Sequence, residues 1–351
     1  MSKKCSAFAF FIGLTLASCI ISESRHTIAF SGKTMPILFQ AIEKCDSGRI
    51  VDFNTIGNLE IAIVDSLAVV STSADKEAWK IISLDKDSLV AEFVDAGNGP
   101  NELNVIPLLS QASFIENLGH KVIAIPDFFG QRWHKVNIGK AASGAKDSSL
   151  VVEDSDLGSN VIYNGLFGNG IEYRITVDPI GLCIKRTISI NGEPLEIDSV
   201  DRLNEFTVER ADQLGLLMPT VALSPTHNKV VEIYNSYPQI NLYSLSDDYA
   251  ITLLPDGESA DYEKYMRNNS SMAKLIYRGI KGYDEFFVIN KVKGDNETEL
   301  QFLTWNGIHL QSMVIPAVVT SFDIDFNNNR LLAIDYMKDE IREYELPASI
   351  K

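Results

Sequence analysis

Two aspartates near the C-terminus, Asp323 and Asp325, stand two residues apart and precede the asparagines at 327–329. Carboxylate and amide oxygens at such spacing are typical of calcium loops. An EF-hand loop also needs a glycine at its sixth position and a glutamate at its twelfth, where this chain has Asn328 and Ile334. We therefore interpret the segment as a strand that faces a channel and ends in an asparagine-rich turn. An alternative hypothesis is that Asp323 and Asp325 share the channel face and help to bind a cation there.

A second candidate site is the segment 97–102, whose sequence GNGPNE predicts a tight loop. No lysine followed by serine or threonine comes after it, so it is not a phosphate-binding loop. We interpret it as a connection between repeats. The alternative hypothesis places Gly97, Gly99, Pro100 and Glu102 on a rim, where they touch a ligand.

The other residue types that could perform chemistry do not converge in the sequence. The five histidines are scattered, and none lies four residues from another. The G-x-S-x-G sequence of a hydrolase nucleophile elbow is absent. We assign no catalytic residue, no metal ligand and no cofactor. A metal-dependent lyase or hydrolase at the channel mouth stays as the alternative, and it would require histidines and carboxylates to meet at the axis.

An internal repeat predicts the elements that must position these residues. Residues 330–346, RLLAIDYMKDEIREYEL, read as two short apolar strands joined by a polar turn. In the second strand, Ile341, Tyr344 and Leu346 are apolar at offsets of zero, three and five. The same offsets recur from Trp79, Trp133, Ile240 and Leu300, and a degenerate copy near Ile184 has Lys185 at an apolar position.

The repeats are spaced by roughly 40–60 residues, which is typical of four-stranded propeller blades. We therefore predict an all-β fold, a six-bladed β-propeller with four-stranded antiparallel blades. The inner strands, which line the central channel, are expected at 61–64, 112–115, 221–223 and 322–326. Because the first and last blades of a ring must be joined, we expect an N-terminal strand from within 28–55 to complete the last blade.

The N-terminus has the features of an export signal. Lys3 and Lys4 precede a short apolar run at 7–16, which is typical of a signal peptide. The next residues, Leu-Ala-Ser-Cys at 16–19, resemble the lipobox of bacterial lipoproteins, in which the cysteine is acylated. We predict a lipoprotein signal peptide at 1–18, a lipidated tether at 19–48 that begins at Cys19, and the propeller at 49–351. An ordinary secretory signal is the alternative.

Charge and cysteine content limit the possible partners and cross-links. The chain carries a formal net charge of −16, with 31 basic and 47 acidic residues. Nucleic-acid binding needs a basic surface, so we expect no nucleic-acid partner. Of the four cysteines, Cys45 and Cys183 stay in the mature chain with no assigned role. A disulfide between them suits an oxidising compartment, but their spacing indicates no pair, so we favour two buried thiols.

Together, the lipobox, the strand repeats, the G-x-G-P-x-E segment at 97–102 and the segment 223–243 resemble one family. It is the family of TolB-like six-bladed β-propeller lipoproteins of Bacteroides and relatives, and the resemblance covers about residues 50–346. It implies a tethered binding or scaffolding module that faces the cell envelope, with no established activity and no catalytic residues.

The predicted function follows from the anchor and the fold. We predict a cell-envelope lipoprotein, anchored in the outer membrane, whose propeller binds a protein or glycan partner through its rim loops without catalysis. A scaffold within a larger complex is a further alternative, which the fold cannot separate from a binding module.

Overall fold

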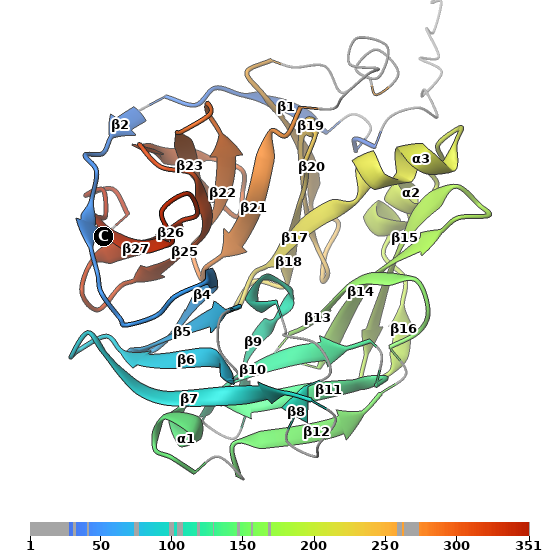
Figure 1. Ribbon diagram of the computed structural model, residues 1–351. Coiled ribbons are helices and arrows are strands. Elements are labelled where there is room, and N and C mark those ends of the chain that lie inside the picture. The colour runs from blue at the N-terminus through green and yellow to red at the C-terminus, as the bar shows by residue number, and fades with distance from the viewer. Residues whose placement is uncertain are drawn as a thin grey trace, which may run out of the picture.

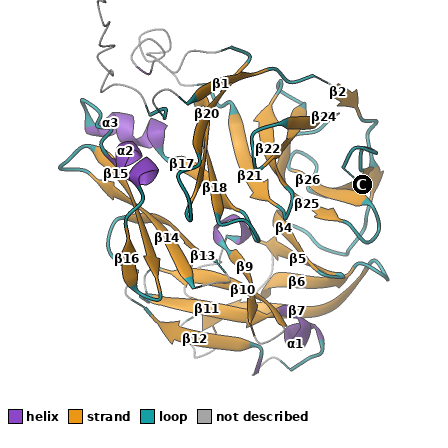
Figure 2. Cartoon of the chain, turned by 180° about the vertical axis from the view of Figure 1, so that it is seen from behind, coloured by secondary structure: helices purple, strands orange, loops and turns teal. Residues whose placement is uncertain are grey.

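The computed structural model describes residues 28–350, apart from 31–32, 41, 74–76, 98–101, 104–107, 118–119, 129, 146–147, 156, 168–169, 258–261 and 263–273. Its strands form six sheets that are arranged as the blades of a ring (Figure 1). This arrangement confirms the predicted six-bladed propeller with four-stranded antiparallel blades. The view from behind shows a molecule made mainly of strands, with short helices in the connections (Figure 2).

The strands follow one another blade by blade along the chain. Blade 1 contains β4 (Asn58–Val64), β5 (Leu67–Thr72), β6 (Glu77–Ser83), β7 (Ser88–Ala96) and the short β8 (Glu102–Leu103). Blade 2 contains β9 (Ser113–Asn117), β10 (His120–Asp127), β11 (Arg132–Asn137) and β12 (Leu150–Asp154), and blade 3 contains β13 (Val161–Leu166), β14 (Ile171–Asp178), β15 (Cys183–Ile190) and β16 (Glu193–Leu195).

The second half of the ring continues the same order. Blade 4 contains β17 (Pro219–Leu223), β18 (Lys229–Tyr234), β19 (Tyr237–Ser244) and β20 (Ala250–Pro255), and blade 5 contains β21 (Tyr277–Gly282), β22 (Phe286–Val292), β23 (Thr298–Thr304) and β24 (His309–Ile315). Blade 6 contains β25 (Val319–Asp325), β26 (Arg330–Asp335) and β27 (Glu340–Glu345). The helices are η1 (Leu109–Gln111), α1 (Ile138–Ala142), α2 (Asp198–Asn204), α3 (Ala211–Leu214) and η3 (Gly215–Leu217).

The repeat found in the sequence is the third strand of each blade. Its anchor residues Trp79, Trp133, Ile240, Leu300 and Ile341 lie in β6, β11, β19, β23 and β27, and all are buried. Each blade packs on a neighbour across both of its faces, so in most blades the central strands are buried on both sides, whereas β14 of blade 3 alternates. In β26, for example, every residue is buried.

Blade 3 departs from the apolar pattern because a charged residue occupies its core. Its third strand, β15, buries Ile184, Arg186 and Ile188, whereas Lys185 is only partly buried. The copy is degenerate in the sequence because the position of Lys185, which is apolar in the other copies, is only partly buried here.

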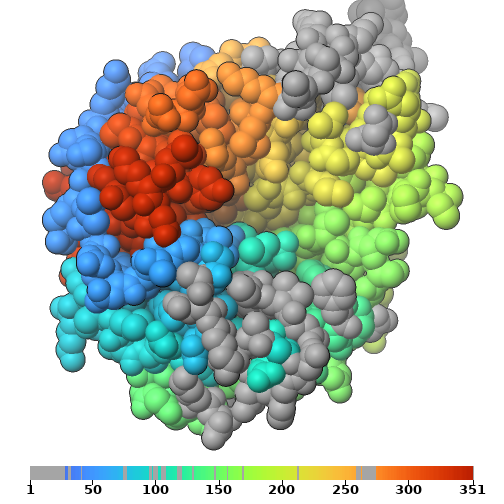
Figure 3. Space-filling model, in the orientation of Figure 1, coloured from blue at the N-terminus to red at the C-terminus, as the bar shows by residue number. Residues whose placement is uncertain are grey.

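An N-terminal segment completes three blades, and we call residues 34–50 the belt. Its strands are β1 (Thr34–Ile37), which pairs parallel with β20; β2 (Ile42–Lys44), which pairs parallel with β24; and β3 (Arg49–Ile50), which pairs antiparallel with β27. The pairing of β3 confirms that an N-terminal strand closes the ring. Figure 3 shows this segment, in blue, against the last blade, in red. From Thr34 on, the segment expected to be a tether is therefore part of the sheets.

Two charged contacts strengthen the closure of the ring. Arg49 of β3 donates to both carboxylate oxygens of Glu343 in β27, with distances of 2.6 and 2.8 Å. Arg330 of β26 reaches from blade 6 to blade 1, where it bonds Asp87 at 2.7 Å and the carbonyl oxygen of Leu84 at 3.1 Å. The last blade is thus fastened to the N-terminal segment and to the first blade.

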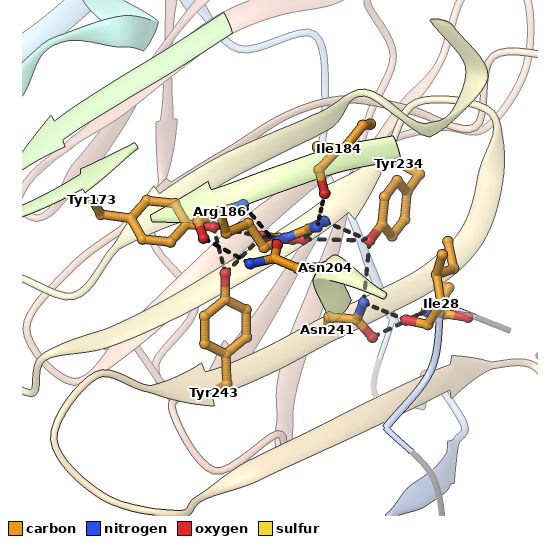
Figure 4. A network of polar contacts seen from close by, with 10 residues as sticks. Ile28, Tyr173, Ile184, Arg186, Asn204, Tyr234, Asn241 and Tyr243 are labelled. Carbon is orange, nitrogen blue, oxygen red and sulfur yellow. Dashed lines mark hydrogen bonds and ion pairs between the residues drawn. The ribbon is translucent and has the colours of Figure 1, made fainter. Parts of the chain in front are cut away.

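A buried polar network joins blade 3 to blade 4 (Figure 4). Arg186 donates to both carboxylate oxygens of Glu232, at 2.7 and 2.8 Å, and the two residues are 5% and 0% exposed. The hydroxyls of Tyr173 and Tyr243 also donate to Glu232. Burial alone would raise the pKa of Glu232, but Arg186 and the two hydroxyls lower it below its usual value. The carboxylate is therefore ionised and fully bonded inside the core.

We predict that Arg186→Met destabilises the protein by about 3–5 kcal/mol, because it leaves the buried charge of Glu232 without a cation. Urea unfolding followed by far-UV circular dichroism measures the change. The control is Lys135→Met, which removes a pair with the half-exposed Glu153 and is expected to cost about 1 kcal/mol or less. If both variants lose the same amount of unfolding free energy, the buried pair contributes no more to stability than the exposed pair does.

The stability of the ring is also expected to depend on pH through Glu343. Its hydrogen bond with Arg49 is the largest cause of a lowered pKa. The stabilisation from the ionised form is therefore complete above the usual pKa of Glu343 and is lost as the pH falls through the lowered value. Glu343→Gln should reduce the free energy of unfolding at pH 7, by about 1 kcal/mol because Arg49 is well exposed.

The difference from the unaltered protein should shrink toward pH 3, which urea unfolding across this pH range can measure. The control is Glu193→Gln on the exposed strand β16, which should show no such trend. A difference for Glu343→Gln that stays constant with pH would contradict the prediction.

Candidate functional site

The inner strands of all six blades surround a central cavity of about 1250 Å³. These strands are β4, β9, β13, β17, β21 and β25, and four of them are the inner strands expected from the sequence. Their cavity-facing residues include apolar, hydroxyl and charged side chains. The cavity is therefore the candidate site to which all six blades contribute.

Four inner strands carry a β-bulge at their second residue. The register of pairing shifts there in β4, β13, β21 and β25, and the additional residues are Leu59, Ile162, Arg278 and Thr320. A bulge turns a side chain away from the direction that regular pairing would give it. Of the four, Ile162, Arg278 and Thr320 line the cavity.

Asp323 lines the cavity, but its carboxylate is already engaged. It forms an ion pair with Lys281 of β21 and accepts a hydrogen bond of 3.0 Å from the hydroxyl of Tyr283. It also accepts one of 2.5 Å from the backbone N–H of Ile63 in β4. Burial and the nearby Asp323 carboxylate raise the pKa of Tyr283 well above its usual value, so its hydroxyl stays protonated and can donate. Asp323 thus connects blades 5, 6 and 1.

Asp325 does not line the cavity. Its side chain is fully buried and accepts hydrogen bonds from Arg330 at 3.0 Å and from the side chain of Asn328 at 2.8 Å. In the alternative hypothesis, both aspartates share the channel face and help to bind a cation there. In the structure, protein cations occupy both carboxylates, Lys281 at Asp323 and Arg330 at Asp325. The hypothesis of a metal enzyme depended on carboxylates that are free at the axis.

The loop at 97–102 is partly outside the described residues, which include Gly97 and Glu102 but not Gly99 or Pro100. The N–H of Gly97 donates to the carbonyl oxygen of Leu103, and β8 pairs parallel with β7. A Cβ at Gly97 would collide with the carboxylate of Glu102. The described ends of the loop therefore fold back on blade 1, and neither Gly97 nor Glu102 lines the cavity.

The cysteines of the described chain, Cys45 and Cys183, do not line the cavity. Cys45 and Cys183 are free thiols, and burial raises the pKa of Cys45 to about 11. The lipidation candidate Cys19 lies outside the described residues. Within the described ranges, no three histidine, cysteine, aspartate or glutamate side chains gather closely enough to hold a metal ion. The same ranges contain no helix with the length and apolar character needed to cross a membrane.

Sequence reasoning missed the inner strand of blade 5, which carries two cavity-lining cations. Its sequence, YRGIKG, holds Arg278 and Lys281 between glycines and lacks the alternation of apolar and polar residues that marks a half-buried strand. A signal was nevertheless present, because two basic residues stand three positions apart where the repeat spacing leaves room for an inner strand of blade 5.

No protein family and no curated protein matches this sequence. Among solved structures, the chain is similar to a protein of Bacteroides fragilis that is described as exported, with 12% identity, 85% of this chain and 88% of that chain covered, and a TM-score of 0.46. It is similar to the calcium-binding protein regucalcin of Agrobacterium tumefaciens, with 11% identity, 87% and 95% covered, and a TM-score of 0.47. It is also similar to U3-55K, with 8% identity, 85% and 98% covered, and a TM-score of 0.48. At these values the likenesses carry no argument about function.

We predict that Asp323→Ala destabilises the ring by about 2–4 kcal/mol, because the substitution leaves Lys281, Tyr283 and the N–H of Ile63 without their shared acceptor. Thermal and urea unfolding measure the effect. Asp284→Ala is the matched control, since Asp284 is an exposed carboxylate on the same cavity and its loss should change stability little. If Asp323→Ala unfolds at the same temperature and the same urea concentration as the unaltered protein, Asp323 does not hold the blades together.

Proposed function

We propose that this protein is a cell-envelope lipoprotein of the TolB-like propeller type, anchored in the outer membrane through acylated Cys19. Its propeller acts as a non-catalytic module that binds a protein or glycan partner at the central cavity and its rim. The lipobox at residues 16–19 supports the anchor. The observation that carries the binding function is the cavity itself.

The cavity is suited to binding because of its size and lining. At about 1250 Å³ it exceeds the ~300–1,000 Å³ of ordinary small-molecule sites, so it can take an extended ligand. Its walls combine apolar groups such as Phe114 with hydroxyls and charges such as Thr220 and Lys281. At one mouth Phe326 is 52% exposed and packs against the rings of Tyr283 and Phe286. Such a mixture of aromatic and polar groups favours recognition of a specific partner.

The fixed position of Ile28 limits how far the propeller can stand from the membrane in this proposal. Ile28 is buried, and its carbonyl oxygen accepts hydrogen bonds from Gln239 and Asn241, both at 2.9 Å. The path from Cys19 to Ile28 spans nine residues, which can extend to about 30 Å at most. Blade 4, which holds Ile28, would then face the membrane.

We predict that a partner from detergent-solubilised envelope binds the native lipoprotein and also binds a Cys19→Ala form added to the same extract. Only the native form should sediment with membranes. Ala112→Trp places an indole at the wall of the cavity and should abolish capture because it fills the binding space. Thr187→Trp, on the exposed side of β15, is the control and should leave capture intact.

Captured proteins and glycans are identified by mass spectrometry, and circular dichroism verifies that each variant is folded. If Ala112→Trp and Thr187→Trp reduce the capture of the partner equally, binding at the cavity is contradicted. A Cys19→Ala form that still sediments with membranes would contradict the lipid anchor.

A further inference from the structure

Arg278 differs from the other cations of the central cavity in this strongly acidic protein. It is the additional residue of the bulge in β21, and it lines the central cavity. Among the described residues, no ion pair or hydrogen bond involves its side chain, and its Nε atom is buried and unbonded. The other cavity cations differ, since Lys281 pairs with Asp323 and Lys121 pairs with Asp65 at 2.7 Å. Arg278 is therefore available for an anion.

Asn290 is a second unsatisfied group beside Arg278. Its side chain is 0% exposed and lines the cavity, and it pairs in register with Gly279, the residue after Arg278. Its Nδ2 donates to the carbonyl oxygen of Val319 at 2.9 Å, whereas its Oδ1 has no partner within the described structure. A buried acceptor without a donor costs about 1–3 kcal/mol. The Oδ1 of Asn290 thus has no donor among the described residues.

Thr320 is the third such group, and it adjoins the other two. It follows Val319, the residue that Asn290 contacts, and it is the additional residue of the bulge in β25. Its Oγ1 is buried, has no partner among the described atoms and belongs to the cavity wall. Two bulges and one amide therefore place three unsatisfied polar groups at neighbouring positions where β21 and β25 begin.

The three groups define the chemistry of a ligand. The guanidinium of Arg278 donates and is always charged, so it requires an anionic acceptor such as a carboxylate. The Oδ1 of Asn290 requires a donor, and the hydroxyl of Thr320 can accept or donate. The ligand must therefore carry an acid group with hydroxyl or N–H donors close to it.

The cavity wall favours a sugar over an added peptide strand. Side chains of neighbouring blades already cap several N–H groups on the inner strand edges. Ser321 accepts from Ile61 at 3.0 Å, and Ser113 accepts from Leu166 at 2.8 Å. A peptide that added as a strand would need such backbone groups free. An acidic sugar can bind through its carboxylate and ring hydroxyls, and it does not need free backbone groups.

We propose that Arg278, Asn290 and Thr320 form a subsite for an acidic saccharide, in which Arg278 binds the carboxylate and Asn290 and Thr320 bind hydroxyls. The subsite rests on the proposed function and specifies its glycan form. It takes uronic or sialic acid residues and rejects the matching neutral sugars.

The test is calorimetric titration of the lipid-free Cys19→Ala protein with trigalacturonate, a hyaluronan tetrasaccharide and sialyllactose. Neutral galactotriose and lactose are the matched ligands. We expect at least one acidic sugar to bind and its neutral counterpart to bind at least about tenfold more weakly. Arg278→Gln should reduce the affinity for the acidic sugar by about 10–100-fold, because a charge-assisted contact is lost. The control Arg202→Gln, on the exposed helix α2, should bind as the unaltered protein does.

Three outcomes would overturn the subsite: no acidic sugar of the panel binds, acidic and neutral sugars bind equally, or Arg278→Gln binds as well as the control does. Binding of peptides with a C-terminal carboxylate, in place of the sugars, would also overturn it. Failure of the subsite is distinguishable from failure of the proposed function. If Arg278→Gln still captures the envelope partner and Ala112→Trp does not, the cavity binds a partner of another class.

Discussion

The join between the last blade and the first is the constraint on which the rest of the structure depends. Every inter-blade core requires two neighbours, and blades 6 and 1 are neighbours only if the ring closes. Several polar contacts cross this join. Ser321 and Asp323 accept hydrogen bonds from inner-strand N–H groups of β4. Arg330 bonds Asp87, and Asp339 accepts from the N–H groups of Gly57 and Asn58. The apolar cluster behind them includes Ile334 and Ile341 of blade 6 with Ile61 and Val70 of blade 1. The polar contacts therefore fix how blade 6 aligns with blade 1, and the burial of the apolar cluster makes the closure of the ring favourable.

Buried charges also fix the contact between neighbouring blades elsewhere in the ring. The pair of Arg186 and Glu232 fixes how blade 3 meets blade 4, and the adjoining amide of Asn241 fixes Ile28 at the same interface. Buried pairs add little to stability compared with apolar packing, but they penalise any arrangement that leaves one partner alone. The cavity shows the contrast, because the cations Lys281 and Lys121 are paired, whereas Arg278 has no partner in the described part of the chain.

The sequence predicted the parts of the fold that the internal repeat marks. Apolar spacing from Trp79 to Ile341 predicted the third strands, and the need for closure predicted β3. Strands β1 and β2 were missed because they are short and mostly exposed, so no apolar pattern marks them. The engagement of Asp323 and Asp325 by Lys281 and Arg330 was not predictable either, since the choice of partner depends on which strands meet in space. Arg278 was missed because a bulge, and not a motif, turns it toward the cavity.

The order of the belt strands has a mechanical consequence. A pull on the N-terminus enters the body at Ile28, whose carbonyl oxygen two blade 4 amides hold. The force must then detach β1 from blade 4, and next β2 from blade 5, before it reaches β3. The strand that closes the ring is thus the last in the series to bear load. Blades 4 and 5 therefore hold the N-terminal segment one after the other, so a pull on it can fray two sheet edges while the ring stays closed.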